Sequence, residues 1–260
     1  MKRISIPVVY AIALALGGMA GSASAAEIKV LSTIALQSVM EDLAPQFERA
    51  AGDKVTITFG LSGAIVKRVQ EGETADLLLV PQSAVDGLLK AGKVQPGSDF
   101  SLARSSVGVA VRKGAPKPDI STPEALKRTL VAAESISYSN PAFGGASGVH
   151  FAKVLERLGI AEEMKAKTKH PPEGGLAARL LAAGEAEIAV QQIGELISIE
   201  GVDLLGPLPG DLQSVTTYAA AIPSAVHQPG SARALIRYLQ SPKAAAVMKA
   251  KGLDPIADSR

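Results

Sequence analysis

The chain has 260 residues with 27 basic and 25 acidic side chains, and this near balance excludes a nucleic-acid-binding protein that relies on a strongly basic surface. It contains no cysteine, so disulfides, thiolate metal ligands and a cysteine nucleophile are all excluded. Its three histidines, His150, His170 and His227, include no pair spaced four residues apart, and we expect neither a metal nor a cofactor.

The first 25 residues have the pattern of a secretory signal peptide. Lys2 and Arg3 precede an apolar stretch from Ile6 to Leu16, and small residues then end in an A-x-A pattern. A membrane-spanning helix needs about 20 unbroken apolar residues, whereas Pro7 and the glycines interrupt this segment. We therefore predict cleavage after Ala25 and export to the periplasm of a mature chain of 235 residues with no formal net charge.

Strands and helices alternate in the first part of the mature chain. We expect strands at 27–33, 54–59 and 76–80, and helices at 35–52, 64–72 and 83–93. The third strand, DLLLV, shows no polar alternation, which is typical of a strand covered on both faces. This alternation predicts an α/β fold with a mainly parallel sheet.

Two β-rich runs, 105–114 and 214–223, bracket a second α/β series. Within this series we expect helices at 121–130, 147–159, 175–186 and 193–201, and strands at 135–139, 187–192 and 202–206. Two helices, 230–240 and 241–252, end the chain. The pattern predicts two lobes joined by two crossing strands, with one continuous sheet as the alternative. We assign 26–105 to lobe 1, 106–216 to lobe 2, and 217–260 to the return into lobe 1.

Two turns of the sequence resemble known catalytic motifs, but each lacks residues that its motif requires. A nucleophile elbow needs G-x-S-x-G between a strand and a helix, and the GLSG turn at 60–63 lacks that spacing. A phosphate-binding loop needs a lysine after its last glycine, and the GGASG turn at 144–148 lacks it, along with the G-x-G-x-x-G order. We therefore do not expect a serine hydrolase or a nucleotide-dependent enzyme.

Small polar residues recur where a predicted strand meets a predicted helix. The four turns contain Ser32 and Thr33, Ser62 and Gly63, Ser139 and Asn140, and Ser147 and Gly148. Helix starts expose unpaired N–H groups and the positive end of the helix dipole, which favours anions. Each serine taken alone is typical of a helix cap. Two such turns in each lobe together predict an anion site in the cleft, where the carboxyl ends of the strands meet.

Several other residues are candidates for this cleft. Gln191 and Gln192 follow a buried strand, so we expect at least one to reach into the cleft, with solvent exposure as an equal alternative. Lys67 and Arg68 can neutralise ligand charge, although a solvated helix face is the commoner role. His150 is the candidate for acid–base chemistry, with packing as its alternative role.

Several segments resemble the periplasmic molybdate-binding proteins of ABC transporters. They are IKVLSTIALQSVMEDLAPQFE, TFGLSGAIVKRVQEGETADLLL, GVHFAKVLERLG and SPKAAAVMKAKGL. The resemblance covers nearly all of the mature chain and implies the type II periplasmic binding-protein fold, with a two-strand hinge near Ser106 and Tyr218. It also implies a monomer that closes on a small anionic ligand and passes it to an ABC transporter permease.

The resemblance also implies ligand roles for individual residues. Ser62 matches a serine ligand of the family, while Ser147 and the pair Gly174–Gly175 lie near positions that offer backbone amides. Ala35 and Gln192 stand where the family has a serine and a tyrosine ligand. These replacements favour a different anion, such as an organic acid.

Two functions stay open. The first is a binding protein for a molybdate-like oxyanion or a small organic carboxylate. The second is an enzyme like periplasmic aconitate isomerase, since SNPAFGGASGVHFAKVL and AVQQIGEL are similar to that branch of the family. Isomerisation needs an acid and a base, for which His150 is the candidate. A secreted structural module gains no support from the sequence.

Overall fold

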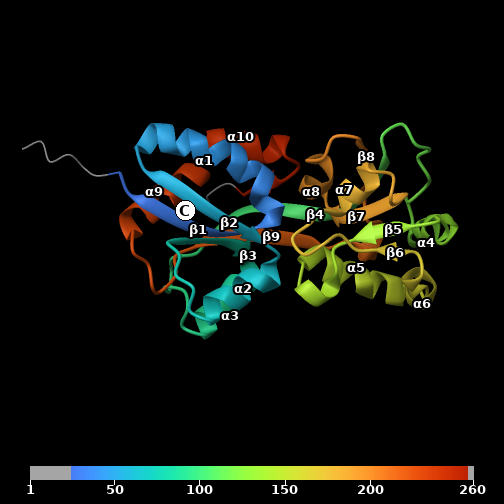
Figure 1. Cartoon of the computed structure of the whole chain (residues 1–260), viewed down its shortest axis with the longest axis horizontal. Helices are drawn as coiled ribbons and strands as arrows, with labels where there is room; N and C mark the ends of the chain where they lie inside the picture. Colours follow the sequence, from blue (N-terminus) through green and yellow to red (C-terminus); the bar gives the residue numbers. More distant parts are fainter. Residues whose placement is uncertain (1–24, 257–260) are drawn as a thin grey trace, which may run out of the picture.

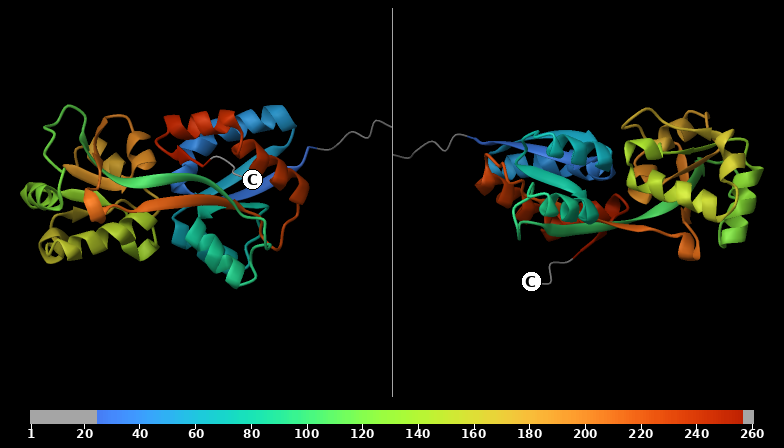
Figure 2. Two further views of the ribbon diagram at one scale, coloured as in Figure 1. Left: turned by 180° about the vertical axis from the view of Figure 1, so that it is seen from behind. Right: turned by 90° about the horizontal axis from the view of Figure 1, so that it is seen from below.

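The computed structural model describes residues 25–256, which form two lobes joined by two extended strands (Figures 1 and 2). The predicted signal peptide up to residue 24 lies outside the described residues. Within 25–256, every helix is too short or too polar to cross a bilayer. The prediction of a two-lobed α/β fold is confirmed.

Lobe 1 is a sheet with helices on both faces. Its strands are β1 (Glu27–Thr33), β2 (Lys54–Gly60), β3 (Leu77–Pro81), β9 (Val215–Ala221), β10 (Asp254–Pro255) and the first half of β4 (Phe100–Arg112). Its helices are η1 (Ile34–Leu36), α1 (Gln37–Ala51), α2 (Ser62–Gln70), α3 (Gln82–Lys90), α9 (Pro229–Leu239) and α10 (Pro242–Ala250). Strands β1, β2 and β3 are parallel, and β9 is antiparallel to both β3 and β4.

The apolar run of β3 explains why both faces of this sheet are covered. Leu77 and Leu79 pack with α1, α9 and α10, whereas Leu78 and Val80 pack with α2 and α3. Successive side chains of a strand point to opposite faces, so an unbroken apolar run requires a core on each side. The prediction for DLLLV is thus confirmed.

Lobe 2 repeats this arrangement around β7. Its further strands are β5 (Ile136–Tyr138), β6 (Thr168–Lys169), β7 (Ile188–Gln192) and β8 (Val202–Pro207). Its helices are α4 (Pro123–Ala132), η2 (Pro141–Phe143), α5 (Ala146–Arg157), α6 (Ala161–Lys165), α7 (Ala177–Ala182), α8 (Ile193–Ile197) and η3 (Gly210–Leu212). Helices α4, α5 and α6 cover one face, and α7 and α8 cover the other.

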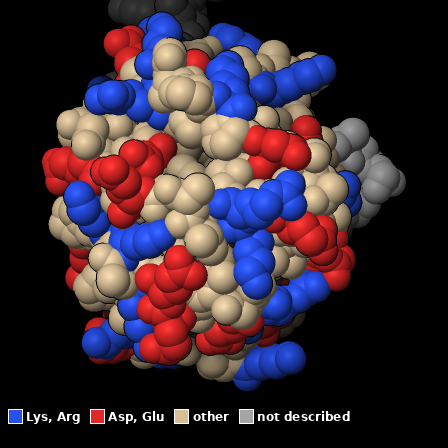
Figure 3. Space-filling view, turned by 90° about the vertical axis from the view of Figure 1, so that its right-hand side faces the viewer, with Lys and Arg blue, Asp and Glu red and all other residues tan. Residues whose placement is uncertain are grey.

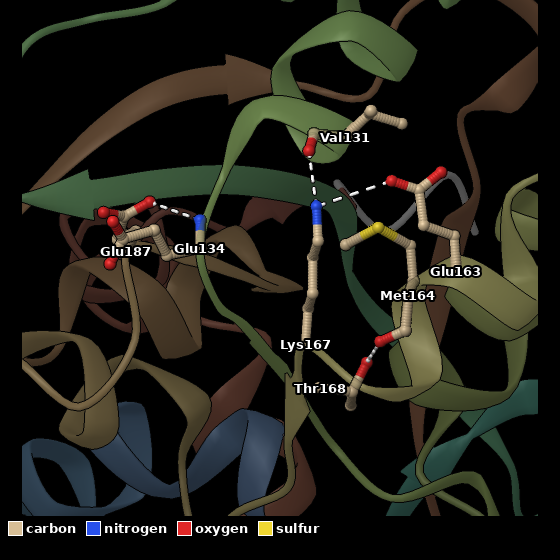
Figure 4. A network of polar contacts seen from close by, with 7 residues as sticks. All are labelled: Val131, Glu134, Glu163, Met164, Lys167, Thr168 and Glu187. Carbon is tan, nitrogen blue, oxygen red and sulfur yellow. Dashed lines mark hydrogen bonds and ion pairs between the residues drawn. The ribbon is translucent and has the colours of Figure 1, made fainter.

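Polar contacts fasten the outer end of lobe 2 (Figure 4). Lys167 Nζ donates to the carbonyl oxygen of Val131 at 2.5 Å, which ties the segment before β6 to α4. The Glu134 backbone N–H donates to Glu187 Oε2 at 2.8 Å. Basic and acidic side chains are interspersed over this end of the molecule (Figure 3), so this face carries no patch of a single sign.

Strand β4 belongs to both lobes. Its residues up to Ser106 pair with β9, and its residues from Val107 pair with β7 and β8. One hydrogen-bonded path therefore runs through both lobes, β2-β1-β3-β9-β4-β7-β5-β6. Tyr218 pairs with Pro81 and Ala103 within lobe 1, so we infer that the second crossing lies near Ser214. The lobe limits 26–105, 106–216 and 217–260 remain a proposal.

The Gln213 side chain holds the two crossings together. Its Oε1 accepts from the Val107 backbone N–H at 3.1 Å, and its Nε2 donates to the Val107 carbonyl oxygen at 3.0 Å. The Val107 N–H also lies 3.2 Å from the carbonyl oxygen of Ser214. Both backbone groups of Val107 are therefore satisfied at the point where β4 changes partners.

Candidate functional site

A small cavity of about 10 Å³ lies between the two lobes, and we call it the interlobe cavity. Its polar lining residues are Thr33, Ser62, Ser139, Ser147, Gln192, Glu195 and Tyr218. This volume is near the lower limit for one water molecule. The lobes are therefore closed on each other, and any larger ligand requires them to open or the cavity to widen.

The lining residues lie at strand ends and helix starts in both lobes. Thr33 ends β1, and Ser62 begins α2 in lobe 1. Ser147 lies in the first turn of α5, and Gln192 ends β7 directly before α8 in lobe 2. The first N–H groups of a helix have no partner within the helix, and the dipole makes this end positive. The cavity therefore lies where several helix N-termini converge.

Hydroxyl and amide groups line the cavity. Thr33 Oγ1 and Ser62 Oγ lie 3.2 Å apart and share a hydrogen bond. The Gln192 side-chain amide lies 3.0 Å from Thr216 Oγ1. With the amide oxygen on that side, its nitrogen donates to Ser105 Oγ at 3.1 Å, and both atoms of the amide then have suitable partners. Gln192 thus connects the cavity to the two crossing strands.

The cavity also contains a buried carboxyl group, Glu195, in the first turn of α8. Its side chain is buried, and its Oε2 accepts from the Gln192 backbone N–H at 3.1 Å. Burial raises the pKa of Glu195 to about 8, and the bond from Gln192 offsets this only in part. Glu195 is therefore mainly protonated at pH 7 and can donate a hydrogen bond.

Tyr218 lies beside Glu195 and is a second titratable group in the cavity. Burial raises the pKa of the Tyr218 hydroxyl well above its usual value, and the nearby Glu195 charge adds to this shift. The lining contains no lysine or arginine from the described part of the chain. At neutral pH the cavity thus offers uncharged donors and helix N-termini to an anion.

Four of the residues predicted for the site lie at this cavity, namely Thr33, Ser62, Ser147 and Gln192. The other predicted residues do not line it and make contacts elsewhere. Ser32 donates to the Thr33 carbonyl oxygen at 3.1 Å. Gln191 accepts from the Ala177 backbone N–H at 2.9 Å and donates to Ser139 Oγ, which does line the cavity, at 3.2 Å.

The remaining candidates have structural contacts. Asn140 caps η2, since its Oδ1 accepts from the Ala142 N–H at 3.0 Å. Gly174 adopts a φ of +73° in the turn before α7, a conformation that favours glycine. The His150 Nε2 lies 2.8 Å from the Leu212 carbonyl oxygen. That contact turns the His150 ring toward η3, and His150 is absent from the cavity lining.

The two basic candidates on α2 lie on its solvent side. Lys67 pairs with Glu71 at 3.8 Å, and Arg68 pairs with Glu73. Neither basic residue lines the interlobe cavity. The described residues also contain no group of three or more His, Asp or Glu side chains suited to hold a metal ion.

Two glycines allow the close approaches that shape the cavity. The Gly63 backbone N–H donates to the Gly144 carbonyl oxygen at 3.2 Å and so links lobe 1 to lobe 2. A Cβ atom at Gly148 would lie 2.0 Å from the Ser139 carbonyl oxygen. Only glycine lets the start of α5 pack directly on the end of β5.

Sequence reasoning missed Glu195 and gave no separate role to Ser139. The EIAVQQIGEL stretch contained a signal for Glu195, because a polar residue at the third position of a helix often accepts from the backbone before that helix. A glutamate in a short helix is usually exposed, so nothing in the sequence indicated its burial.

Comparison with known proteins gives a consistent result. The profile of the family described as bacterial extracellular solute-binding protein matches residues 28–254. An aconitate isomerase from a Pseudomonas species is 37% identical over 235 residues, covering 88% of each chain. The molybdate-binding protein ModA of Azotobacter vinelandii is 32% identical over 250 residues, covering 93% of this chain and 95% of the relative.

The solved structures include the periplasmic molybdate-binding protein of Azotobacter vinelandii. It matches with a TM-score of 0.72 at 22% identity, and the match covers 89% of this chain and 100% of that chain. At this level of identity the match concerns the fold, and it agrees with the two lobes described above.

Proposed function

Since this chain belongs to the family of bacterial extracellular solute-binding proteins, we propose that it captures a small anion between its lobes and delivers it to the permease of an ABC transporter. The anion is a molybdate-like oxyanion or a small organic carboxylate. The protein acts in the periplasm as an exported monomer. Its relatives in the comparison include a molybdate-binding protein and an aconitate isomerase, and both names refer to anions.

The observation that carries this proposal is the composition of the interlobe cavity. Ser62 and Thr33 from lobe 1 and Ser147 from lobe 2 supply hydroxyl groups beside helix N-termini. Uncharged donors and helix dipoles bind anions without a permanent counter-charge. Because no ion pair has to break, the anion can also leave when the lobes open.

Thermal unfolding of the mature protein tests this proposal. The probes are molybdate, tungstate, sulfate, citrate, and cis- and trans-aconitate. A true ligand at a hundredfold excess over Kd stabilises the folded state by about 2.7 kcal/mol. Ser62→Ala and Ser147→Ala should reduce the shift, whereas Ser231→Ala in α9 should not. If no anion in the series raises the Tm, the proposal is wrong.

A second function is favoured by one observation, the carboxyl group of Glu195 in the cavity. Aconitate carries a CH2 group next to its carbon–carbon double bond. A base can remove a proton from this CH2 carbon while the double bond shifts, and a proton then adds to the former vinyl carbon. No oxidant or reductant is needed. A carboxyl group with a pKa of about 8 can take and return this proton, since both of its forms are populated near neutral pH.

Ultraviolet absorbance of cis- and trans-aconitate tests this second function. The wild-type protein should interconvert the isomers, and Glu195→Gln should abolish the reaction while the ligand-induced Tm shift persists. Glu200→Gln, at an exposed position just beyond α8, is the matched control. Tm shifts without interconversion in the wild-type protein would leave binding as the sole function.

A further inference from the structure

A second pocket of about 160 Å³ adjoins the interlobe cavity, and we call it the side pocket. Ile34, Ala35 and Glu195 line both spaces. Its lining residues come from the start of α1 in lobe 1 and from helices α7 and α8 in lobe 2, and Figure 1 shows where these helices lie. Helix α8 also contacts η1 directly, so this pocket is formed by both lobes.

The size of the interlobe cavity limits what it can enclose in the closed form. A space of about 10 Å³ is near the lower limit for one water molecule, so even one carboxylate requires it to widen. An anion with several carboxylates must extend into an adjoining space, and the side pocket and the mouth of the cleft are the two candidates.

The side pocket carries groups that attract a carboxylate. Arg179 of α7 lines it, and none of the ion pairs within residues 25–256 includes this guanidinium. Gln37 and Ser38 also line it and are the first two residues of α1, whose 15 residues give a full helix dipole. Arginine binds carboxylates through two parallel hydrogen bonds, which favours it over other donors.

Two further charges face the side pocket. Lys251 is paired with Asp42 at 3.0 Å, so its charge is already largely compensated. Glu41 is exposed and accepts from Gln37 Nε2 at 2.8 Å. The negative charge of Glu41 repels an anion. The positive charge of Arg179 compensates for this repulsion.

The mouth of the cleft is the less suitable space for a second carboxylate. It has a volume of about 700 Å³ and includes the apolar side chains of Val66, Val149 and Val215. The only charged residue in its described lining is Asp86, which repels anions. Among the described residues, the side pocket therefore offers an unpaired cation, Arg179, that the mouth of the cleft lacks, and the mouth is the more apolar of the two spaces.

We propose that the side pocket binds a second carboxylate of the ligand through Arg179, while a first carboxylate occupies the interlobe cavity. The ligand class is then a di- or tricarboxylate, whereas a single-centre oxyanion would bind in the widened interlobe cavity without reaching Arg179. This inference rests on the proposed anion capture and specifies its substrate class.

Isothermal titration of the mature protein with citrate, cis-aconitate and molybdate tests it. Arg179→Gln should raise the Kd for the two tricarboxylates at least about tenfold, as expected for the loss of a charged hydrogen-bonded pair. The Kd for molybdate, if it binds, should change little. Arg128→Gln on α4 removes the same charge from lobe 2 and should change no affinity. Glu41→Gln should lower the Kd for the tricarboxylates.

The outcomes separate this inference from the function on which it rests. Unchanged tricarboxylate affinity in Arg179→Gln overturns the inference and leaves anion capture standing. If the wild-type protein binds molybdate and neither tricarboxylate, the inference is also overturned and anion capture still stands. An equal loss for all anions assigns Arg179 to lobe closure and also overturns it. If the wild-type protein binds no anion, both proposals fail.

Discussion

The backbone N–H of Gly63 in lobe 1 donates to the carbonyl oxygen of Gly144 in lobe 2, at 3.2 Å. This contact lies beside Ser62 at the rim of the interlobe cavity. A Cβ atom at Gly63 would lie 3.0 Å from the Gly144 Cα and 3.1 Å from the Phe143 carbonyl oxygen. The closed form therefore depends on the absence of a side chain at this position.

Gly63→Val should hinder closure without unfolding either lobe. Gly63 is exposed and has no positive φ, so the substitution strains neither the helix nor a core. We expect the Kd for any captured anion to rise about tenfold or more, because the steric clash destabilises the closed form that binds the anion. Titration calorimetry measures the affinity, and small-angle X-ray scattering measures the closure.

Gly87→Ala provides the control for this prediction. Gly87 lies in α3 with no atom within 4 Å of an added Cβ, so its substitution should leave the affinity unchanged. Alanine is favoured over glycine inside a helix by about 0.5–1 kcal/mol, so Gly87→Ala should keep or raise the Tm. A Gly63→Val protein with wild-type affinity would show that this contact does not limit closure.

Glu195 should make the stability of the protein depend on pH. Its pKa is about 8 in the folded state against an ordinary value of 4.5, so the folded state binds more protons than the unfolded state between these values. Stability is then full below about pH 4.5 and falls as the pH rises toward 8, by at most about 1.4 kcal/mol per pH unit. Urea unfolding from pH 5 to pH 8 measures this slope.

Glu195→Gln should remove this part of the pH dependence. Glutamine keeps the shape of the side chain and cannot ionise, so the stability curve of the variant should be flatter over the same range. Glu200→Gln, at an exposed position, should retain the wild-type slope. Equal slopes in the wild-type and Glu195→Gln proteins would contradict the assignment of a buried, protonated carboxyl group.

The alternation of strands and helices was predictable because it depends on local patterns. The apolar run of β3 and the turn before Ser62 each indicate their structure within a few residues. The start of β4 was missed: it begins at Phe100, whereas we expected a strand from Ser105. The SLAR segment there mixes exposed and buried residues, and pairing with β9 makes it a strand.

The sequence predicted that the site lies at the ends of strands, but it did not predict which residue of a strand end faces the cleft. Gln191 and Gln192 were equal candidates from the sequence. Adjacent strand residues point to opposite faces, so only Gln192 reaches the cavity and Gln191 points toward α7. Which of the two faces the cleft depends on the sheet register. Glu195 is buried beside Ile34 and Ala35 of lobe 1, residues far from it in the sequence, so no local pattern indicates its burial.

Removing the Gln213 side chain should destabilise the protein, because this side chain bonds both backbone groups of Val107 where the chain crosses between lobes. Gln213→Leu keeps a similar volume and removes both bonds. We expect a loss of about 1–3 kcal/mol in the free energy of unfolding, since the Val107 carbonyl and N–H lose a partner in a partly buried site. Urea unfolding measures this loss.

The same substitution should also loosen the orientation of the lobes. The crossing at Val107 retains its backbone bonds to Ser214 and Leu208, so the variant should still fold. Hydrogen exchange of the Val107 amide should become faster than in the wild-type protein, because its opening requires fewer bonds to break. Gln240→Leu, at the end of α9 in lobe 1, is the matched control. Wild-type exchange at Val107 in the Gln213→Leu protein would show that the backbone pairing alone sets the stiffness of this crossing.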